Sequence, residues 1–211
     1  MSAASQDAAL ESAAERPVGE LGMWVFLATE VLFFGVLFCG YVVMRWYYPQ
    51  GFAAASRHTD VVIGSANTAV LLTSSLTMAL AVQSLQQGAA RRTVWLLAAT
   101  LLLGAAFLGL KLYEYRDDYL RHLVPWLDFV FPGRHAGGAR LFFYMYFVMT
   151  GAHALHLTVG LGVVTVMIIG VARGAFSRER AAPVEVAALY WHLIDVVWIF
   201  LYPILYLVAR T

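Results

Sequence analysis

Five long apolar stretches constrain the fold of this chain more than any other feature. A helix rises about 1.5 Å per residue, so roughly 20 apolar residues cross the hydrocarbon of a bilayer. The stretches lie at 21–44, 61–85, 93–112, 141–171 and 184–209. Lipid offers no hydrogen-bond partner to irregular backbone, so each stretch should be a helix. The sequence therefore predicts an all-α integral membrane protein folded as a five-transmembrane-helix bundle.

Composition agrees with a membrane protein and sets other classes aside. Hydrophobic residues make up 61% of the 211 and charged residues 13%, against about 45–50% and about 25% in soluble domains. A net charge of +1 provides no basic surface for nucleic acid. The sequence contains no nucleophile elbow, phosphate-binding loop or dinucleotide fingerprint. We therefore predict no catalytic, cofactor-binding or metal site on this chain.

The segments outside the spans are short, with two exceptions. Residues 1–20 form a polar, acidic lead that we expect to be disordered, before a membrane domain at 21–211. The connection at 114–140 contains two prolines and three glycines, which predict a loop with one interfacial turn at 119–126. Basic residues flank the spans on both sides, so the positive-inside rule does not select an orientation.

Glu30 is an acidic residue in the middle of the first span. It lies roughly 14 Å from the start of that helix, near the midplane of the bilayer. An acidic group there costs on the order of 2.5–3.5 kcal/mol on insertion scales, so Glu30 should face protein or water. Two interpretations stay open: a proton-linked or reagent-reactive carboxyl, or a neutral acid hydrogen-bonded between helices.

The fourth and fifth spans carry further ionisable residues. His153 and His156 share one helix face in the fourth span, and Glu185, His192 and Asp195 cover less than a quarter of the circumference of the fifth. Two opposed histidines could clamp a haem if they lay at one depth. From the shared membrane side, however, His192 lies roughly 12 Å deep and His156 about 22 Å deep. The gap disfavours a shared haem.

The same depths predict two tiers of interhelical hydrogen bonds. The inner tier would contain Glu30, His156 and Asp195, and the outer tier Asn67, Lys111 and His153.

Small residues line one face of the second span and predict close helix packing. They are Gly64, Thr68, Ser75 and Ala79, with Asn67 beside them. In the third span, Lys111 and Glu114 are three residues apart near the predicted helix end, as expected of a snorkelling pair at the interface. Trp24, Trp191 and Trp198 are candidate contacts to lipid or to a partner protein.

Several of these residues belong to longer motifs that together identify a family. In chain order the motifs are G-M-W-V-F-L-A-T-E-V-L-F-F from Gly22, N-T-A-V-L-L-T-S-S from Asn67, K-L-Y-E-Y from Lys111, Y-F-V-M-T-G-A-H-A-L-H-L-T-V-G-L from Tyr146 and V-E-V-A-A-L-Y-W-H-L-I-D-V-V-W-I-F-L-Y from Val184. Over residues 20–207 the chain resembles subunit III of haem-copper respiratory oxidases, in the short five-helix bacterial version. Long members have two further N-terminal helices, which form one wall of a cleft that holds phospholipid.

The resemblance implies a non-catalytic subunit of a terminal oxidase that reduces oxygen to water and pumps protons. Haem and copper would belong to partner subunits I and II, with subunit I as the main contact, a small subunit IV as a further partner, and bound phospholipid. The chain would cross the bacterial inner membrane with a cytoplasmic N-terminus and a periplasmic C-terminus. The polar residues Glu30, Glu114, His153, His156, Glu185, His192 and Asp195 would hold the bundle and lipid against subunit I, near its proton-uptake path.

Two other classes remain open from the sequence. Short relatives also accompany nitric oxide reductases, so the chain could be an accessory membrane subunit of such an enzyme. A stand-alone transporter or b-type cytochrome is the third class, although a transporter usually shows broken helices or paired repeats, and neither is evident. The electron donor of an oxidase, cytochrome c or quinol, is not determined by these residues.

Overall fold

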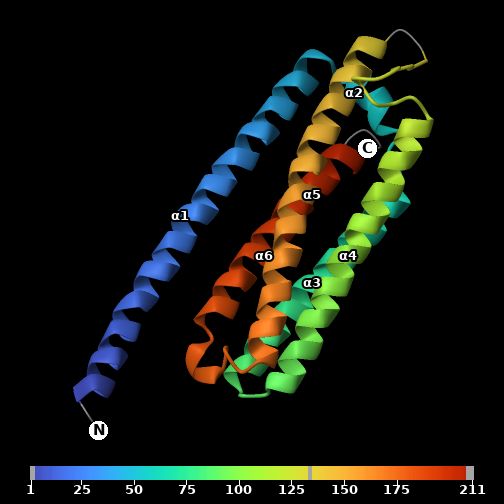
Figure 1. Ribbon diagram of the computed structural model, residues 1–211. Coiled ribbons are helices and arrows are strands. Elements are labelled where there is room, and N and C mark those ends of the chain that lie inside the picture. Colours follow the sequence, from blue (N-terminus) through green and yellow to red (C-terminus); the bar gives the residue numbers. More distant parts are fainter. Residues whose placement is uncertain (1–2, 133–134, 208–211) are drawn as a thin grey trace.

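The computed structural model describes residues 3–132 and 135–207, and the side chains from residue 21 onward within those ranges (Figure 1). Its helices are α1 (Ala3–Tyr47), α2 (Pro49–Ser56), α3 (Val61–Gln86), α4 (Ala90–Leu120), α5 (Ala136–Ala172) and α6 (Ala182–Tyr202), with the short turns η1 (Arg178–Arg180) and η2 (Pro203–Leu207). Five helices are long and apolar enough to cross a membrane. The predicted all-helical architecture is confirmed for the described residues, where no strand occurs; positions 208–209 of the last predicted span lie outside them.

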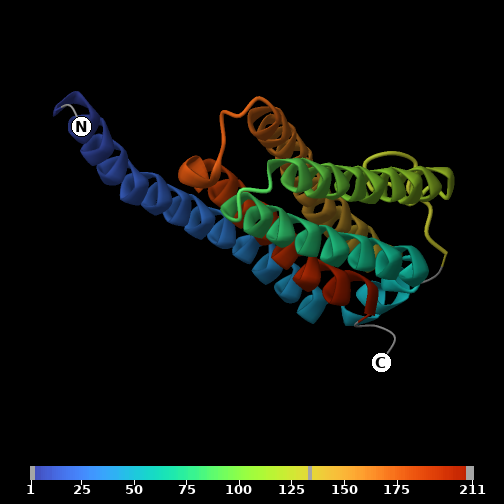
Figure 2. The ribbon, with the colours of Figure 1, turned by 90° about the horizontal axis from the view of Figure 1, so that it is seen from below.

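The helices form one bundle with two ends. The N-terminus and the α3–α4 and α5–α6 turns lie at one end, which we call the N-side, and α2 and the α4–α5 loop lie at the other, the C-side (Figure 1). The helices α3, α4, α5 and α6 pack against one another. Helix α1 contacts α5 and α6, but its N-terminal part diverges from the bundle (Figures 1 and 2). The bundle is therefore compact on four helices and open beside the first.

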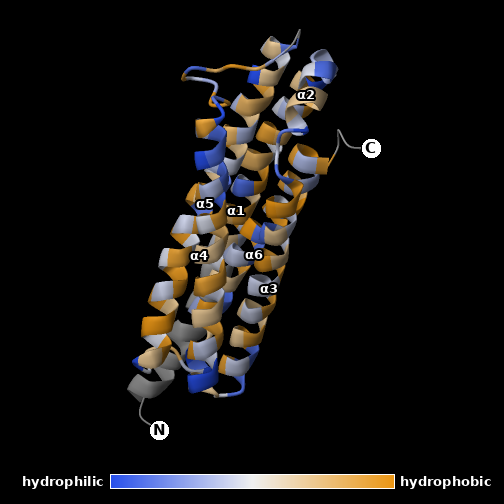
Figure 3. Ribbon diagram, turned by 90° about the vertical axis from the view of Figure 1, so that its right-hand side faces the viewer, coloured by the Kyte–Doolittle hydropathy of each residue, from blue (hydrophilic) through white to orange (hydrophobic). Residues whose placement is uncertain are grey.

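Local signals in the sequence set several helix ends. The Asp60 carboxylate caps α3 by accepting hydrogen bonds from the Val62 and Ile63 amides at 2.8 and 3.1 Å. Gly88 takes a positive φ of 80° in the turn between α3 and α4, a conformation that favours glycine. Hydrophobic residues dominate the middle of the helices and hydrophilic ones gather at both ends, with a few hydrophilic positions inside the bundle (Figure 3).

The structure differs from the sequence prediction at the N-terminal lead, at the ends of several helices and in one additional short helix. The lead at 1–20 was expected to be disordered, but residues 3–20 continue α1 as helix, because the segment is rich in alanine and the first span supplies a helical nucleus. Helix α4 runs to Leu120 instead of residue 112, since no glycine or proline occurs between Gly109 and Pro125. The short helix α2, which begins with Pro49, was missed.

Trp191 and Trp198 lie in the centre of the core. They were predicted to contact lipid or a partner protein, but in the structure they are buried within this chain. They are 1% and 0% exposed. The Trp191 indole donates a hydrogen bond to the Ser74 hydroxyl at 3.2 Å, and its ring fits between α4 and α5 because Gly104 and Gly160 leave room for it. A Cβ atom on Gly104 would lie 2.7 Å from Trp191 Cη2. Burying the indole inside the chain was more favourable than exposing it, since its N–H finds a partner there.

We predict that Gly104→Ala lowers the free energy of unfolding by about 1–3 kcal/mol, because the new methyl group overpacks against Trp191. Gly109→Ala on the same helix is the control, because nothing lies within 4 Å of a Cβ there. Alanine should stabilise that site by up to about 1 kcal/mol through helix propensity. Unfolding of both variants in detergent measures the difference, and equal effects would contradict the proposed close packing.

Candidate functional site

Lys111 is the centre of a buried polar cluster that joins three elements. Its ammonium donates to Glu114 Oε2 at 2.9 Å, to the Tyr206 hydroxyl at 2.5 Å and to the Tyr146 hydroxyl at 3.3 Å. Tyr206 in turn donates to Glu114 Oε1 at 2.7 Å. Lys111 and Glu114 are only 2% and 4% exposed. The cluster thus fixes α4 to α5 and to the π-helical turn η2.

Four aromatic rings complete the surroundings of the ammonium. The Lys111 nitrogen lies 5.0 Å from the ring centroids of Tyr146 and Trp198, 5.2 Å from that of Tyr206 and 5.7 Å from that of Tyr115. Such contacts stabilise a desolvated cation through the ring quadrupole. The prediction of a snorkelling pair is wrong, because α4 continues for nine residues, or about 14 Å, beyond Lys111.

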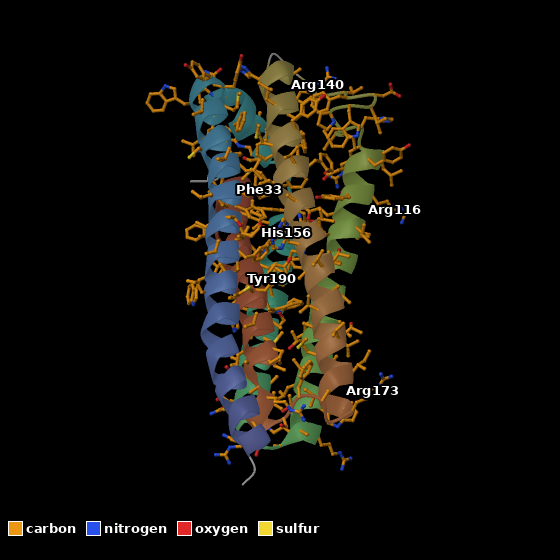
Figure 4. All side chains as sticks on the ribbon, turned by 60° about the vertical axis from the view of Figure 1, so that its left-hand side comes forward. Phe33, Arg116, Arg140, His156, Arg173 and Tyr190 are labelled. Atoms are coloured by element: carbon orange, nitrogen blue, oxygen red, sulfur yellow. The ribbon has the colours of Figure 1, made fainter. Side chains whose placement is uncertain are left out.

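Glu30 and His156 form the second polar contact, between α1 and α5. His156 Nε2 lies 3.0 Å from Glu30 Oε2, and the two side chains are 21% and 16% exposed. Phe33 and Phe34 pack on the imidazole with centroid separations of 6.0 and 5.2 Å. Figure 4 shows Phe33, His156 and Tyr190 gathered between α1, α5 and α6, whereas Arg116 and Arg173 extend away from the bundle. This arrangement supports the interpretation of Glu30 as an interhelical hydrogen-bonding group.

The hydrogen bonds of His156 determine how many protons the pair holds. His156 Nδ1 lies 2.7 Å from the Ala152 carbonyl oxygen, which can only accept, so Nδ1 carries a hydrogen. The contact between Nε2 and Glu30 then needs one more proton, on either the carboxyl or the imidazole. In both states the pair is neutral as a whole, which suits its place in the middle of a membrane span.

The face of α6 that points to α3 is bonded to the small and polar residues of α3. Glu185 accepts from the Gln86 amide at 2.8 Å, and the His192 ring bonds the Ser75 hydroxyl at 2.8 Å. The Trp198 indole donates to the Thr68 hydroxyl at 3.1 Å.

Gly64 serves the same interface by close approach. A Cβ atom there would lie 2.9 Å from the Tyr202 ring. The predicted packing face of α3 is therefore a contact surface for α6.

Two buried polar side chains, those of Asn67 and His153, make no hydrogen bond within the described part of the chain; they are 0% and 1% exposed. Asp195 is 3% exposed, and its hydrogen-bonding neighbour is Ser75, whose hydroxyl also bonds the His192 ring. The His153 ring lies between the rings of Phe107 and Trp198, at 5.4 and 5.1 Å.

The tier prediction is right in that Glu30 bonds His156 and Lys111 bonds Tyr146 and Tyr206. It is wrong for Asn67 and His153, which have no hydrogen-bond partner among the described residues. Residues three positions apart differ by about 60° around a helix, which turns His156 toward α1 and His153 into the core. The depth of a residue in the membrane does not show which of these two histidines faces another helix's polar group and which faces the core.

Two grooves follow the divergent part of α1. One, of about 480 Å³, is lined by Trp24 of α1, by Ala79 and Val82 of α3, and by Glu185 and His192 of α6. The other, of about 420 Å³, is almost entirely apolar and lies between α1, α5 and α6. Trp24 is 60% exposed.

Sequence reasoning missed the tyrosines of the Lys111 cluster and also Asp118. Tyr146 lies seven residues before His153, and Asp118 seven after Lys111, so helical spacing places each on the face of a residue already singled out. Tyr206 had no such signal, because the π-helical turn at Pro203–Leu207 changes the spacing.

The fold and these contacts define a multi-pass, all-helical membrane protein whose ionisable side chains cross-link its own helices. The family described as cytochrome c oxidase subunit III matches residues 12–210. Cytochrome c oxidase subunit 3 of Bacillus subtilis (strain 168) is 32% identical over 191 residues, which cover 90% of this chain and 86% of that relative. Quinol oxidase subunit 3 of the same strain is 30% identical over 189 residues, with the same coverage.

The chain belongs to the cytochrome c oxidase subunit III family. It is therefore a non-catalytic subunit III of a haem-copper oxidase, and the resemblance seen in the sequence motifs is confirmed. Cytochrome bo(3) ubiquinol oxidase subunit 3 of Pseudomonas aeruginosa, 29% identical over 89% of this chain and 84% of its own length, is a further relative. These names favour an oxidase over a nitric oxide reductase.

Lys111→Met should lower the free energy of unfolding in detergent by about 3–5 kcal/mol, because it leaves the Glu114 carboxylate buried without its cation. The Lys111→Met/Glu114→Gln double variant removes both charges and should recover most of this loss. Asp117→Asn, in the exposed Asp117–Arg121 pair, is the control and should cost at most about 1 kcal/mol. Denaturation by SDS measures all three, and a Lys111 variant no weaker than the control would rule out the cluster as a structural anchor.

Glu30→Gln should remain close to the parent protein, because the new amide can donate to the unprotonated Nε2 of His156. Glu30→Leu removes the bond and should cost about 1–3 kcal/mol. Hydrogen exchange in α1 should rise in the leucine variant alone, since Glu30 connects α1 to α5. If both variants exchange like the parent, packing alone holds α1 in place.

Proposed function

We propose that this chain supports the assembly and sustained turnover of the oxidase, while the redox chemistry belongs to partner subunits. The observation that carries the proposal is that ionisable groups inside the spans bond one another, in the Lys111–Glu114–Tyr206 cluster and the Glu30–His156 pair. In the described residues no three His, Cys, Asp or Glu side chains converge as a metal site would require. Membership of the oxidase subunit III family leads us to assign haem and copper to subunits I and II.

The open side of the bundle suits contacts to partners and lipid. Large apolar residues on α1 are exposed, among them Leu32 at 70%, Val36 at 71% and Trp46 at 83%. A surface of this kind faces lipid or another membrane helix. We assign it to subunit I as the main contact, with subunit II and a small subunit IV nearby. The groove beside Trp24 would take a phospholipid chain, with Glu185 and His192 as its polar part.

The Glu30–His156 pair would act on the neighbouring subunit through the position of α1. It ties α1 to α5 near the middle of the membrane. A fixed α1 would keep the proton-uptake entrance of subunit I in shape. The pair is thus a positioning device, and its proton need not leave the pair during turnover.

The same proposal includes a location and an orientation. The chain would lie in the bacterial inner membrane with its N-side toward the cytoplasm and its C-side toward the periplasm. This orientation rests on the resemblance to the family, since arginines flank the spans on both sides. Relatives are named for cytochrome c and for quinol alike, so the donor is left to experiment.

Comparing the complex with and without this chain tests the proposal. The reduced-minus-oxidised haem spectrum of the complex should be unchanged on removal of the chain, and oxygen reduction should start normally but decline faster during turnover. The isolated chain should show no Soret band. A band corresponding to one haem per chain, or turnover of nitric oxide in place of oxygen, would contradict the assigned function.

A further inference from the structure

A cavity of about 290 Å³ opens at the C-side between the start of α3 and the end of α4. Four carboxyl groups line it, those of Asp60, Glu114, Asp117 and Asp118. His58 and Arg121 are exposed at its surface. The cavity therefore connects the aqueous C-side with the buried Glu114 of the Lys111 cluster.

Three of the four carboxyl groups are already bonded. Glu114 is paired with Lys111, and Asp117 with Arg121 at 2.7 Å. Asp60 caps α3, as described above. Neither His58, whose Nδ1 lies 3.1 Å from the Ala54 carbonyl, nor any other group in the described residues hydrogen-bonds the fourth carboxyl, that of Asp118.

Asp118 is nevertheless almost completely buried. It is 7% exposed, and its charged neighbours are Glu114, Lys111, Asp117 and Arg121, whose charges already balance in pairs. A carboxylate held in this way is unfavourable, so the group either takes up a proton or pairs with a cation from elsewhere. The cavity in front of Asp118 leaves room for such a group.

The arrangement favours a basic side chain over a metal ion. Metal ions such as Ca²⁺ and Mg²⁺ need several oxygen ligands within about 2.0–2.6 Å, and no three acidic side chains of the described residues converge on one point. A guanidinium or ammonium group instead presents several donors in different directions, so it can bridge carboxyl groups that lie farther apart.

We propose that this cavity is a socket for a lysine or arginine side chain of a partner subunit, with Asp118 as its main acceptor and Asp60 at its entrance. The partner follows from the chain's membership of an oxidase subunit family and from the opening of the cavity at an extramembrane end. The proposal does not depend on the role assigned to Glu30 and His156. It places one polar contact of the complex at the C-side, away from the lipid-exposed face of α1.

The test compares complexes that carry the parent chain, Asp118→Asn or the control Asp117→Asn, purified with their natural partners. The measured quantity is the rate at which this subunit dissociates as the NaCl concentration rises. Asp118→Asn should dissociate roughly tenfold faster, because a charge-assisted hydrogen bond is lost. Asp117→Asn should stay within about twofold of the parent, because its exposed pair contributes little. Equal dissociation of the parent and Asp118→Asn complexes would overturn the proposal.

The isolated chain separates a partner's cation from one within this chain. Without its partner, Asp118→Asn should unfold in detergent at the same temperature as the parent or higher, because an uncompensated charge has been removed. A lower temperature would mean that the cation belongs to this chain and would overturn the proposal. Arg134→Gln and Arg210→Gln provide the second check, because these two arginines of the same chain lie outside the described residues. If the complex with either variant loses this subunit as fast as the Asp118→Asn complex does, the cation belongs to this chain and the proposal is overturned.

Discussion

A cation buried in a membrane-spanning bundle needs its partners within the protein, and Lys111 shows what that requirement does to a fold. Its ammonium is satisfied only if α4, α5 and η2 meet at one point, since Glu114, Tyr146 and Tyr206 come from these three elements. Tyr206 reaches the cluster from a π-helical turn that begins at Pro203. The Tyr41 hydroxyl donates to the Ile204 carbonyl in that turn at 2.8 Å, which ties the end of α1 to the same point. One charge thus organises the C-side half of the molecule.

The Glu30–His156 pair connects helices near the middle of α1, as the Lys111 cluster connects helices at the C-side. The Glu30–His156 pair and the Tyr41–Ile204 bond attach α1 along its C-terminal half, while its N-terminal part diverges from the bundle (Figure 2). The two grooves lie beside that divergent part. The α3–α6 part is held by many contacts within the chain, whereas α1 has fewer such contacts and exposes many large apolar side chains.

The positions of the spans could be predicted from the sequence, because they depend on apolarity along the chain. The partners of individual side chains were missed, because they depend on the direction in which each residue points around its helix. Five spans could be placed because their length and hydrophobicity match the bilayer. The burial of Lys111 was missed because apolar character ends near residue 112 although the helix continues. Asn67 and His153 were placed at one depth, but neither forms the predicted hydrogen bond. Trp191 looked exposed to a partner, because nothing in its own segment shows that Gly104 and Gly160 make space for it.

The unbonded polar groups show which forces dominate in the core. A buried polar group without a hydrogen bond costs about 1–3 kcal/mol, and Asn67 and His153 have no partner among the described residues. Trp191 and Trp198 lie among them, and aromatic side chains of this size bury about 150–250 Å² each. Their indole hydrogen bonds to Ser74 and Thr68 run to α3, so packing and direction are set by the same residues. The polar groups at the centre of the core are thus surrounded by aromatic contacts that specify how α3, α5 and α6 fit together.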